Sequence, residues 1–81
     1  MIIKIVGSRN INFKNDNGEE VRGTQYAYLF EDPHINGYWY DKFFIAEGRS
    51  LPVEIIVGHD YDISSYFRST RLDFQSLKLV K

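Results

Sequence analysis

The segment Asn15-Asp16-Asn17-Gly18 constrains the fold more than any other part of the chain. Asn and Gly tolerate the positive φ that tight turns require, so this segment predicts a hairpin turn between two strands. Residues 1–14 are strand-like, with a break at Gly7-Ser8-Arg9-Asn10, and residues 19–30 form the longest predicted strand. The first third of the chain therefore predicts a long antiparallel hairpin.

Three further strands are expected in the remaining sequence, with turns or loops between them. They are predicted at residues 38–46, 59–67 and 71–80. The apolar residues 53–57 are too short for more than a brief strand or one helical turn. No stretch has the periodicity of an amphipathic helix of three turns.

The predicted fold class is all-β, with residues 1–81 as one domain. Eighty-one residues leave no room for a second hydrophobic core. Five strands joined by short connections favour a small five-stranded antiparallel barrel of the OB type. An open twisted sheet and an SH3-like barrel remain alternatives. A core of this size is marginal, which makes a homodimer a reasonable expectation.

The absence of Cys excludes disulfide frameworks and thiolate metal sites, and it favours a cytoplasmic protein. The apolar stretch Met1 to Gly7 is too short for a signal peptide or a membrane span, so no membrane partner is expected.

Catalytic residues are few, and the chain is expected not to be an enzyme. His34 and His59 lie in or beside turns, and no glycine-rich phosphate loop or nucleophile elbow occurs. Asp60 and Asp62 fall on one strand face while His59 points the other way, which is too few convergent ligands for a metal. No cofactor or metal is expected.

Aromatic side chains interleaved with basic residues are the strongest functional signal. Aromatic residues make up 16% of the chain. Single-stranded nucleic acid is bound by flat rings that stack on bases and by cations that contact phosphates. We expect a nucleic-acid-binding site formed by Arg22, Tyr26, Tyr28, Tyr40, Lys42, Arg68 and Arg71.

The division between core and surface follows from strand alternation. Thr24, Tyr26, Tyr28 and Phe30 share one face of the second strand, and Gln25, Ala27 and Leu29 share the other. We expect Ala27, Leu29, Phe43 and Ile45 in the core, which leaves Tyr26 and Tyr28 exposed. Cross-strand packing of the tyrosines is the alternative.

Charge is distributed unevenly along the chain, although the net charge is only −1. Residues 1–14 carry three bases and no acid, and residues 66–81 carry four bases and one acid. Residues 15–65 carry three bases and ten acids. If the two ends of the chain pair in a sheet, the fold has a basic side and an acidic side.

Three segments of the chain resemble a known family. They are Arg22-Gly23-Thr24-Gln25-Tyr26-Ala27-Tyr28, Gly58 ahead of Tyr61-Asp62-Ile63, and the ending Arg71 to Lys81 with its Leu77-Lys78-Leu79-Val80. Over residues 18–81 the chain resembles the small single-stranded DNA-binding proteins of filamentous phages and related mobile elements. The resemblance implies an OB-type barrel that dimerises and coats single strands during DNA replication.

The resemblance also implies roles for single residues. Tyr26 would stack or pack on the DNA-binding wing, Arg22 would contact a phosphate, and Tyr28 would face DNA. Thr24 and Gln25 stand where the family has a more basic, proline-containing sequence. Glu19 and Glu20 add acid nearby, so lower affinity is expected.

Two functions from different classes are therefore open. The first is sequence-independent coating of single-stranded DNA in a phage, plasmid or conjugative element. The second is a protein-interaction module or dimeric accessory protein, in which the exposed aromatic residues form an interface.

Overall fold

The computed structural model describes residues 1–31, 34–65 and 72–80 and has one antiparallel sheet of five strands. The all-β prediction is confirmed. The strands are β1 Ile2–Lys14, β2 Glu20–Glu31, β3 Tyr38–Ala46, β4 Asp60–Ser65 and β5 Leu72–Val80. Their order in the sheet is β3-β2-β1-β4-β5.

The hairpin predicted around Asn15–Gly18 is present. The Asn15 side-chain oxygen accepts hydrogen bonds from the backbone N–H groups of Asn17 and Glu19, both at 3.0 Å. Gly18 has a φ of 77°, which a residue with a side chain rarely adopts. The break expected at Gly7 is instead a bulge, because β1 continues to Lys14 with a register shift between Ile5 and Gly7.

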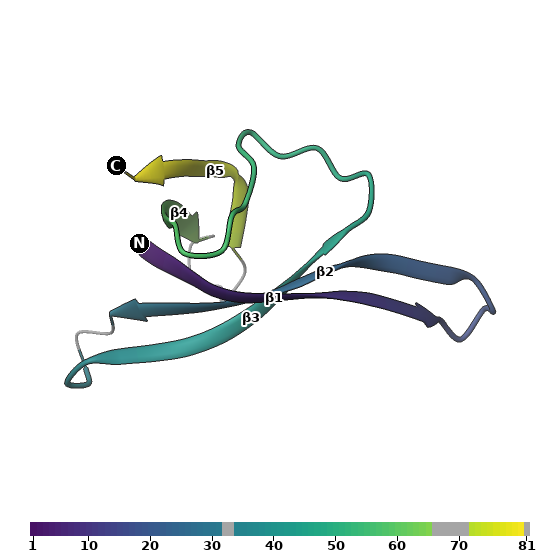
Figure 1. The fold of residues 1–81 in the computed structure, drawn as a ribbon, viewed down its shortest axis with the longest axis horizontal. Coiled ribbons are helices and arrows are strands. Elements are labelled where there is room, and N and C mark those ends of the chain that lie inside the picture. Colours follow the sequence, from purple (N-terminus) through teal and green to yellow (C-terminus); the bar gives the residue numbers. More distant parts are fainter. Residues whose placement is uncertain (32–33, 66–71, 81) are drawn as a thin grey trace.

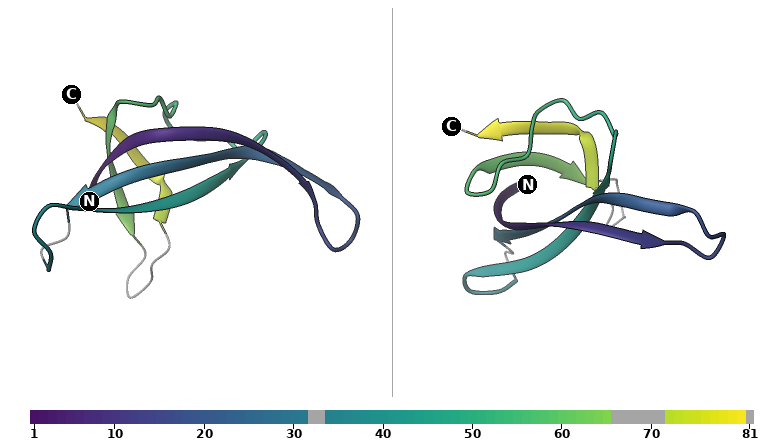
Figure 2. Two further views of the ribbon diagram at one scale, coloured as in Figure 1. Left: turned by 60° about the horizontal axis from the view of Figure 1, so that its bottom comes forward. Right: turned by 45° about the vertical axis from the view of Figure 1, so that its right-hand side comes forward.

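The long strands β1, β2 and β3 form a curved ribbon, and β4, β5 and residues 47–59 lie over one side of it (Figure 1). Beyond the body of the molecule, the distal parts of β1 and β2 project as a two-stranded arm (Figure 2). The core lies between the ribbon and the elements over it. Its buried side chains are Ile3, Ile5, Tyr28, Ile45, Ile55, Tyr61, Ile63 and Leu77.

The strands at the two ends of the sheet, β3 and β5, meet through side chains. The rings of Phe43 and Phe74 lie 5.0 Å apart between centroids, and the Arg49 guanidinium lies 4.8 Å from the Phe74 ring centre. Backbone pairing does not close the sheet among the described residues. The coarse prediction of five antiparallel strands holds, and the sheet is an open one.

Residues 53–57 were expected to form a brief strand or a helical turn, and the structure has neither there. Single contacts hold this irregular segment on the core. Ile55 is buried, the Tyr61 hydroxyl donates to the Glu54 carbonyl at 2.8 Å, and it accepts from the Ile56 N–H at 2.8 Å. These contacts fix the connection between β3 and β4.

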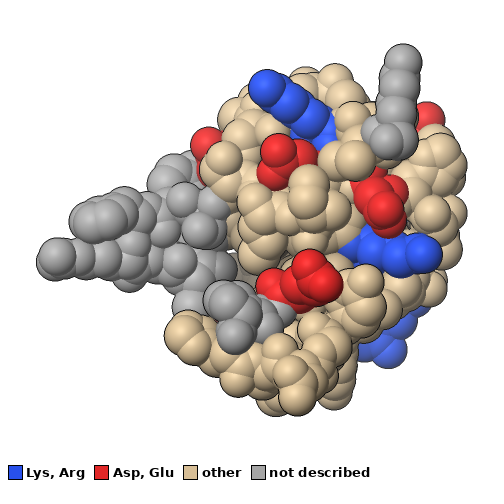
Figure 3. Space-filling model, turned by 90° about the vertical axis from the view of Figure 1, so that its left-hand side faces the viewer, with Lys and Arg blue, Asp and Glu red and all other residues tan. Residues whose placement is uncertain are grey.

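The two basic ends of the chain do not pair, because β4 lies between β1 and β5. The Met1 ammonium group binds the Asp62 carboxylate on β4 at 3.2 Å. At the end of the molecule that carries the termini, acidic and basic side chains are intermixed (Figure 3). The expected division into a basic and an acidic side is therefore absent there. Among the described residues, no helix has the length and apolarity needed to cross a bilayer.

Candidate nucleic-acid interface

The ribbon of β1, β2 and β3 has two faces, which strand alternation and register assign. The inner face packs on the core and carries Tyr26, Tyr28 and Phe30 of β2. Opposite them lie Ser8, Ile5 and Ile3 on β1, and Phe43, Asp41 and Trp39 on β3. The outer face is the opposite side of the same three strands.

Tyr28 belongs to the core, so the expectation of an exposed Tyr28 is wrong. Tyr28 is only 5% exposed, and its ring centroid lies 5.4 Å from that of Phe43 and 5.8 Å from that of Phe30. Burial, and secondly the charge of Asp41, raise the pKa of its phenol. Tyr26 is partly buried against the same cluster, 5.4 Å from Phe43.

Phe43 and Ile45 do pack in the core, as expected. Ala27 and Leu29 were also expected there, and this expectation is wrong because both lie on the outer face. Tyr26, Tyr28 and Phe30 bring more apolar surface to the core than Gln25, Ala27 and Leu29 would. The predicted grouping of residues into two faces was right, and the orientation of the strand was reversed.

Three cross-strand rows in the middle of the outer face each contain one basic residue. The rows are Lys4–Leu29–Tyr40, Gly7–Ala27–Lys42 and Arg9–Gln25–Phe44. Directly opposed residues of antiparallel strands point to the same side, so these side chains share one surface. Tyr40 and Lys42 are the two predicted site residues that the structure brings together here.

The middle row forms the floor of a groove with a volume of about 290 Å³. Gly7 and Ala27 form the floor because they have no side chain or a very small one, and Arg9, Gln25 and Lys42 line the groove. The Arg9 Nε donates to Gln25 Oε1 at 2.8 Å, which fixes the guanidinium across β1 and β2. The two Nη groups of Arg9 stay available for an anion, because guanidinium groups carry five donors.

On the outer face of β3, Tyr40 and Phe44 flank Lys42, which lines the groove. Tyr40 is 66% exposed, and Tyr38, at 65%, is two residues away on the same side of the strand. A Cβ on Gly23 would come within 2.5 Å of the Phe44 ring, so this ring covers the glycine. The outer face thus presents aromatic rings on both sides of Lys42, and Phe44 shares a cross-strand row with Arg9.

A second depression of about 760 Å³ lies further along the ribbon. Lys4, Leu29 and Tyr38 belong to its lining, together with Glu31 and Asp60. Leu29 and Tyr38 belong to the outer face of β2 and β3. The two hollows therefore lie along the same surface, with Tyr40 between Tyr38 and Lys42 on β3.

Arg22 lies on the other face of the ribbon, opposite Asn12. Its Nε and Nη2 groups bind the Glu20 carboxylate at 3.0 and 2.9 Å. The structure thus separates Arg22 from Tyr40 and Lys42, and it partly neutralises the charge of Arg22. Arg68 and Arg71 lie outside the described residues.

Sequence reasoning missed Lys4, Arg9 and Phe44 as candidate contacts. The available signal was the register of the first hairpin, which places Arg9 opposite Gln25 once the bulge at Gly7 is included. Without that bulge, simple alternation puts Lys4 and Arg9 on opposite faces. The site therefore depends on a single extra residue in β1.

The chain matches no family model, no curated protein and no solved structure. The function of this chain is therefore inferred from its own geometry.

Proposed function

We propose that this protein binds single-stranded DNA on the outer face of β1, β2 and β3, without catalysis or cofactor. The observation that carries the proposal is the groove over Gly7 and Ala27, lined by Arg9 and Lys42, with exposed Tyr40 two residues from Lys42 on the same face of β3. Nucleobases stack on the exposed rings, and Arg9 and Lys42 contact phosphates. Stacking needs no particular base, so the binding is sequence-independent.

The strand order supports the finer proposal of an OB-type domain. A five-stranded Greek-key barrel opened between its third and fifth strands has the order β3-β2-β1-β4-β5. OB-type barrels are partly open and bind oligonucleotides on the face of strands two and three. The proposed groove is on that part of the sheet. On the basis of the family resemblance, we further propose that the protein is cytoplasmic and dimeric. It would coat DNA during replication of a phage or mobile element.

The test compares two neighbouring exposed rings of β3 that point to opposite faces. Tyr40 faces the groove side, whereas Trp39 lies opposite Phe30 on the inner side and is 55% exposed. Binding of a fluorescently labelled oligo-dT is measured by anisotropy for the wild type, Tyr40→Ala and Trp39→Ala. Loss of one stacked base costs about 1–3 kcal/mol, so Tyr40→Ala should weaken binding about fivefold or more.

Trp39→Ala should bind like the wild type. Equal effects of the two substitutions, or an effect of Trp39→Ala alone, would place the site elsewhere. Absence of oligo-dT binding by the wild type would refute the proposed function. A parallel titration with oligo-U distinguishes DNA from RNA as the preferred strand.

A protein-interaction role is the second candidate, and one observation favours it. Large apolar side chains are exposed outside the groove, among them Met1, Ile2, Val6, Ile56, Val57 and Leu79. Exposed apolar residues of this kind are suited to a contact with a second copy. Analytical ultracentrifugation tests this role with Leu79→Gln, since Leu79 is 46% exposed and lines none of the described hollows. If this variant dissociates a dimer without changing DNA affinity, the dimer interface is separate from the groove.

A further inference from the structure

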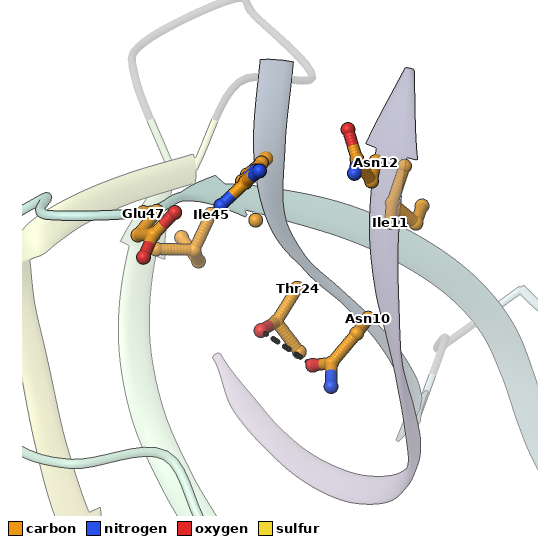
Figure 4. Close-up of a pocket in the computed structure, with 8 residues that line it drawn as sticks. Asn10, Ile11, Asn12, Thr24, Ile45 and Glu47 are labelled. Atoms are coloured by element: carbon orange, nitrogen blue, oxygen red, sulfur yellow. Dashed lines mark hydrogen bonds between the residues drawn. The ribbon is translucent and has the colours of Figure 1, made fainter. Parts of the chain in front are cut away.

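A third hollow lies on the inner side of the ribbon, at the base of the arm, and has a volume of about 450 Å³. Its lining comes from all three long segments: Asn10, Ile11 and Asn12 of β1, Arg22, Gly23 and Thr24 of β2, and Ile45 and Glu47 at the end of β3. In Figure 4, Asn12 and Glu47 stand on opposite sides of the opening. This volume is in the range of small-molecule sites.

The polar groups of this pocket are only partly used within the protein. Thr24 Oγ1 and Asn10 Oδ1 make one long contact of 3.5 Å, the dashed line in Figure 4. Among the described residues, the Asn12 amide and the Glu47 carboxylate have no hydrogen bond or ion pair with another side chain. Ile45, 8% exposed, supplies an apolar surface between them.

Charge limits what the pocket can accept. Arg22 is bound to Glu20, and Glu47 adds a free carboxylate. A phosphate would face this carboxylate without an unpaired cation beside it, so the pocket disfavours anions. A neutral planar group with an amino donor fits better, because a carboxylate only accepts hydrogen bonds.

We propose that this pocket binds a nucleobase that carries an exocyclic amino group, and that it discriminates against thymine. The Glu47 carboxylate accepts from the amino group, as acidic side chains do from cytosine N4. The Asn12 amide supplies one donor and one acceptor to the rest of the base edge. Thymine has no exocyclic amino group, and its single N3–H donor lies between two carbonyl oxygens, which a carboxylate repels.

The inference rests on the proposed function if the nucleobase in the pocket belongs to a bound DNA strand. A free nucleotide presents the same chemistry to the pocket. The pocket lies on the face opposite the groove. A DNA strand bound on the outer face reaches the pocket past the end of β3, where Ala46 is exposed. The base in the pocket would then be read by hydrogen bonds, while its neighbours in the groove are stacked without selection.

The test uses dCMP and TMP as probes, since both carry one phosphate and differ in the base. Backbone amide shifts of Asn12, Gly23 and Glu47 are followed by NMR during each titration. We expect dCMP to bind about fivefold or more tightly than TMP, the lower end of what one base contact discriminates. In Glu47→Gln, whose amide can donate to a thymine carbonyl, the preference should vanish or reverse.

Equal affinities of the wild type for the two nucleotides, or shifts confined to Ala27 and Lys42, would overturn the proposal. So would the absence of any dCMP-induced shift up to the solubility limit. Oligonucleotides give the second arm, with oligo-dC compared against oligo-dT. A preference for dCMP without a preference for oligo-dC indicates a free nucleotide as ligand.

The two proposals fail separately. If Glu47→Gln binds oligo-dT at least as well as the wild type, the groove functions independently of the pocket. If no oligonucleotide binds but dCMP still shifts the pocket residues, the proposed function is refuted and the pocket remains. Thr24→Ser, which keeps the hydroxyl contact to Asn10, is the matched control and should retain the preference for dCMP.

Discussion

The ring of Phe43 on β3 lies 5.0 Å from the ring of Phe74 on β5, so side chains join the two edge strands of the open sheet. Phe43 also contacts Tyr26 and Tyr28, each at 5.4 Å. One aromatic cluster therefore connects β2, β3 and β5. It holds the ribbon that carries the groove against β5.

Substitution Phe74→Ala should destabilise the fold. Because Phe74 is half-buried, we expect a loss of about 1–3 kcal/mol, less than for a fully buried Phe. Urea denaturation measures the free energy of unfolding. Phe13→Ala, on the arm and 49% exposed, is the control and should change it by less than about 0.5 kcal/mol. Equal losses would show that the Phe43–Phe74 contact does not hold the edge strands together.

Tyr61→Phe should lower the free energy of unfolding by about 1–2 kcal/mol, since it removes one hydroxyl that makes two hydrogen bonds. It leaves the Ile56 N–H without its acceptor and the Glu54 carbonyl without its donor. Tyr40→Phe removes an exposed hydroxyl and should be nearly neutral. The pair is compared by thermal and urea unfolding. A neutral Tyr61→Phe would mean that residues 53–57 are held by Ile55 alone.

Gly23→Ala should destabilise the sheet, because the added methyl would meet the Ile45 carbonyl and lie 2.5 Å from the Phe44 ring. Crowding of this kind costs about 1–3 kcal/mol. Gly7→Ala is the matched control, since its nearest contact is Ala27 Cβ at 3.9 Å. It should keep or slightly raise stability by up to about 1 kcal/mol. A destabilised Gly7→Ala would contradict the register between β1 and β2, and a neutral Gly23→Ala would contradict the register between β2 and β3.

Stability should fall at high pH through Tyr28. In the unfolded chain a tyrosine ionises near pH 10, whereas burial first, and Asp41 second, raise the pKa of Tyr28 in the fold. Above about pH 10 the unfolded state therefore binds fewer protons than the native state, and stability decreases with pH. The contribution is complete below the unfolded pKa and lost as pH rises through the folded one.

The comparison with Tyr28→Phe isolates this effect from the other tyrosines. The difference in free energy of unfolding between the wild type and Tyr28→Phe should be constant below about pH 10 and turn against the wild type above it. A difference that is independent of pH up to the end of the accessible range would place Tyr28 in solvent.

Turn chemistry and alternation predicted the strands well. Asn15 to Gly18 gave the first hairpin because its side-chain and glycine geometry are local. The third strand lies at the predicted residues 38–46, since His34 to Gly37 precede it as a loop. The open sheet was only an alternative to the favoured barrel, because closure depends on whether β3 reaches β5, and local sequence does not encode that distance.

The candidate site was predicted in part. Tyr40 and Lys42 are two residues apart on one strand, so alternation places them together. Alternation alone does not tell which face of β2 is buried; the packing of Tyr28 against Ile5 and Phe43 decides it. Arg9 joins the groove only through the bulge at Gly7, and a bulge is a feature of pairing between strands.

The salt dependence of oligo-dT binding tests the central claim most directly. On single strands each phosphate contact contributes about 0.7 to the slope of log K against log salt concentration. The double substitution Arg9→Gln and Lys42→Gln should reduce the slope by about 1.4 while the fold is retained. An unchanged slope in the double variant, or wild-type binding that is independent of salt, would contradict a phosphate-binding groove on the outer face.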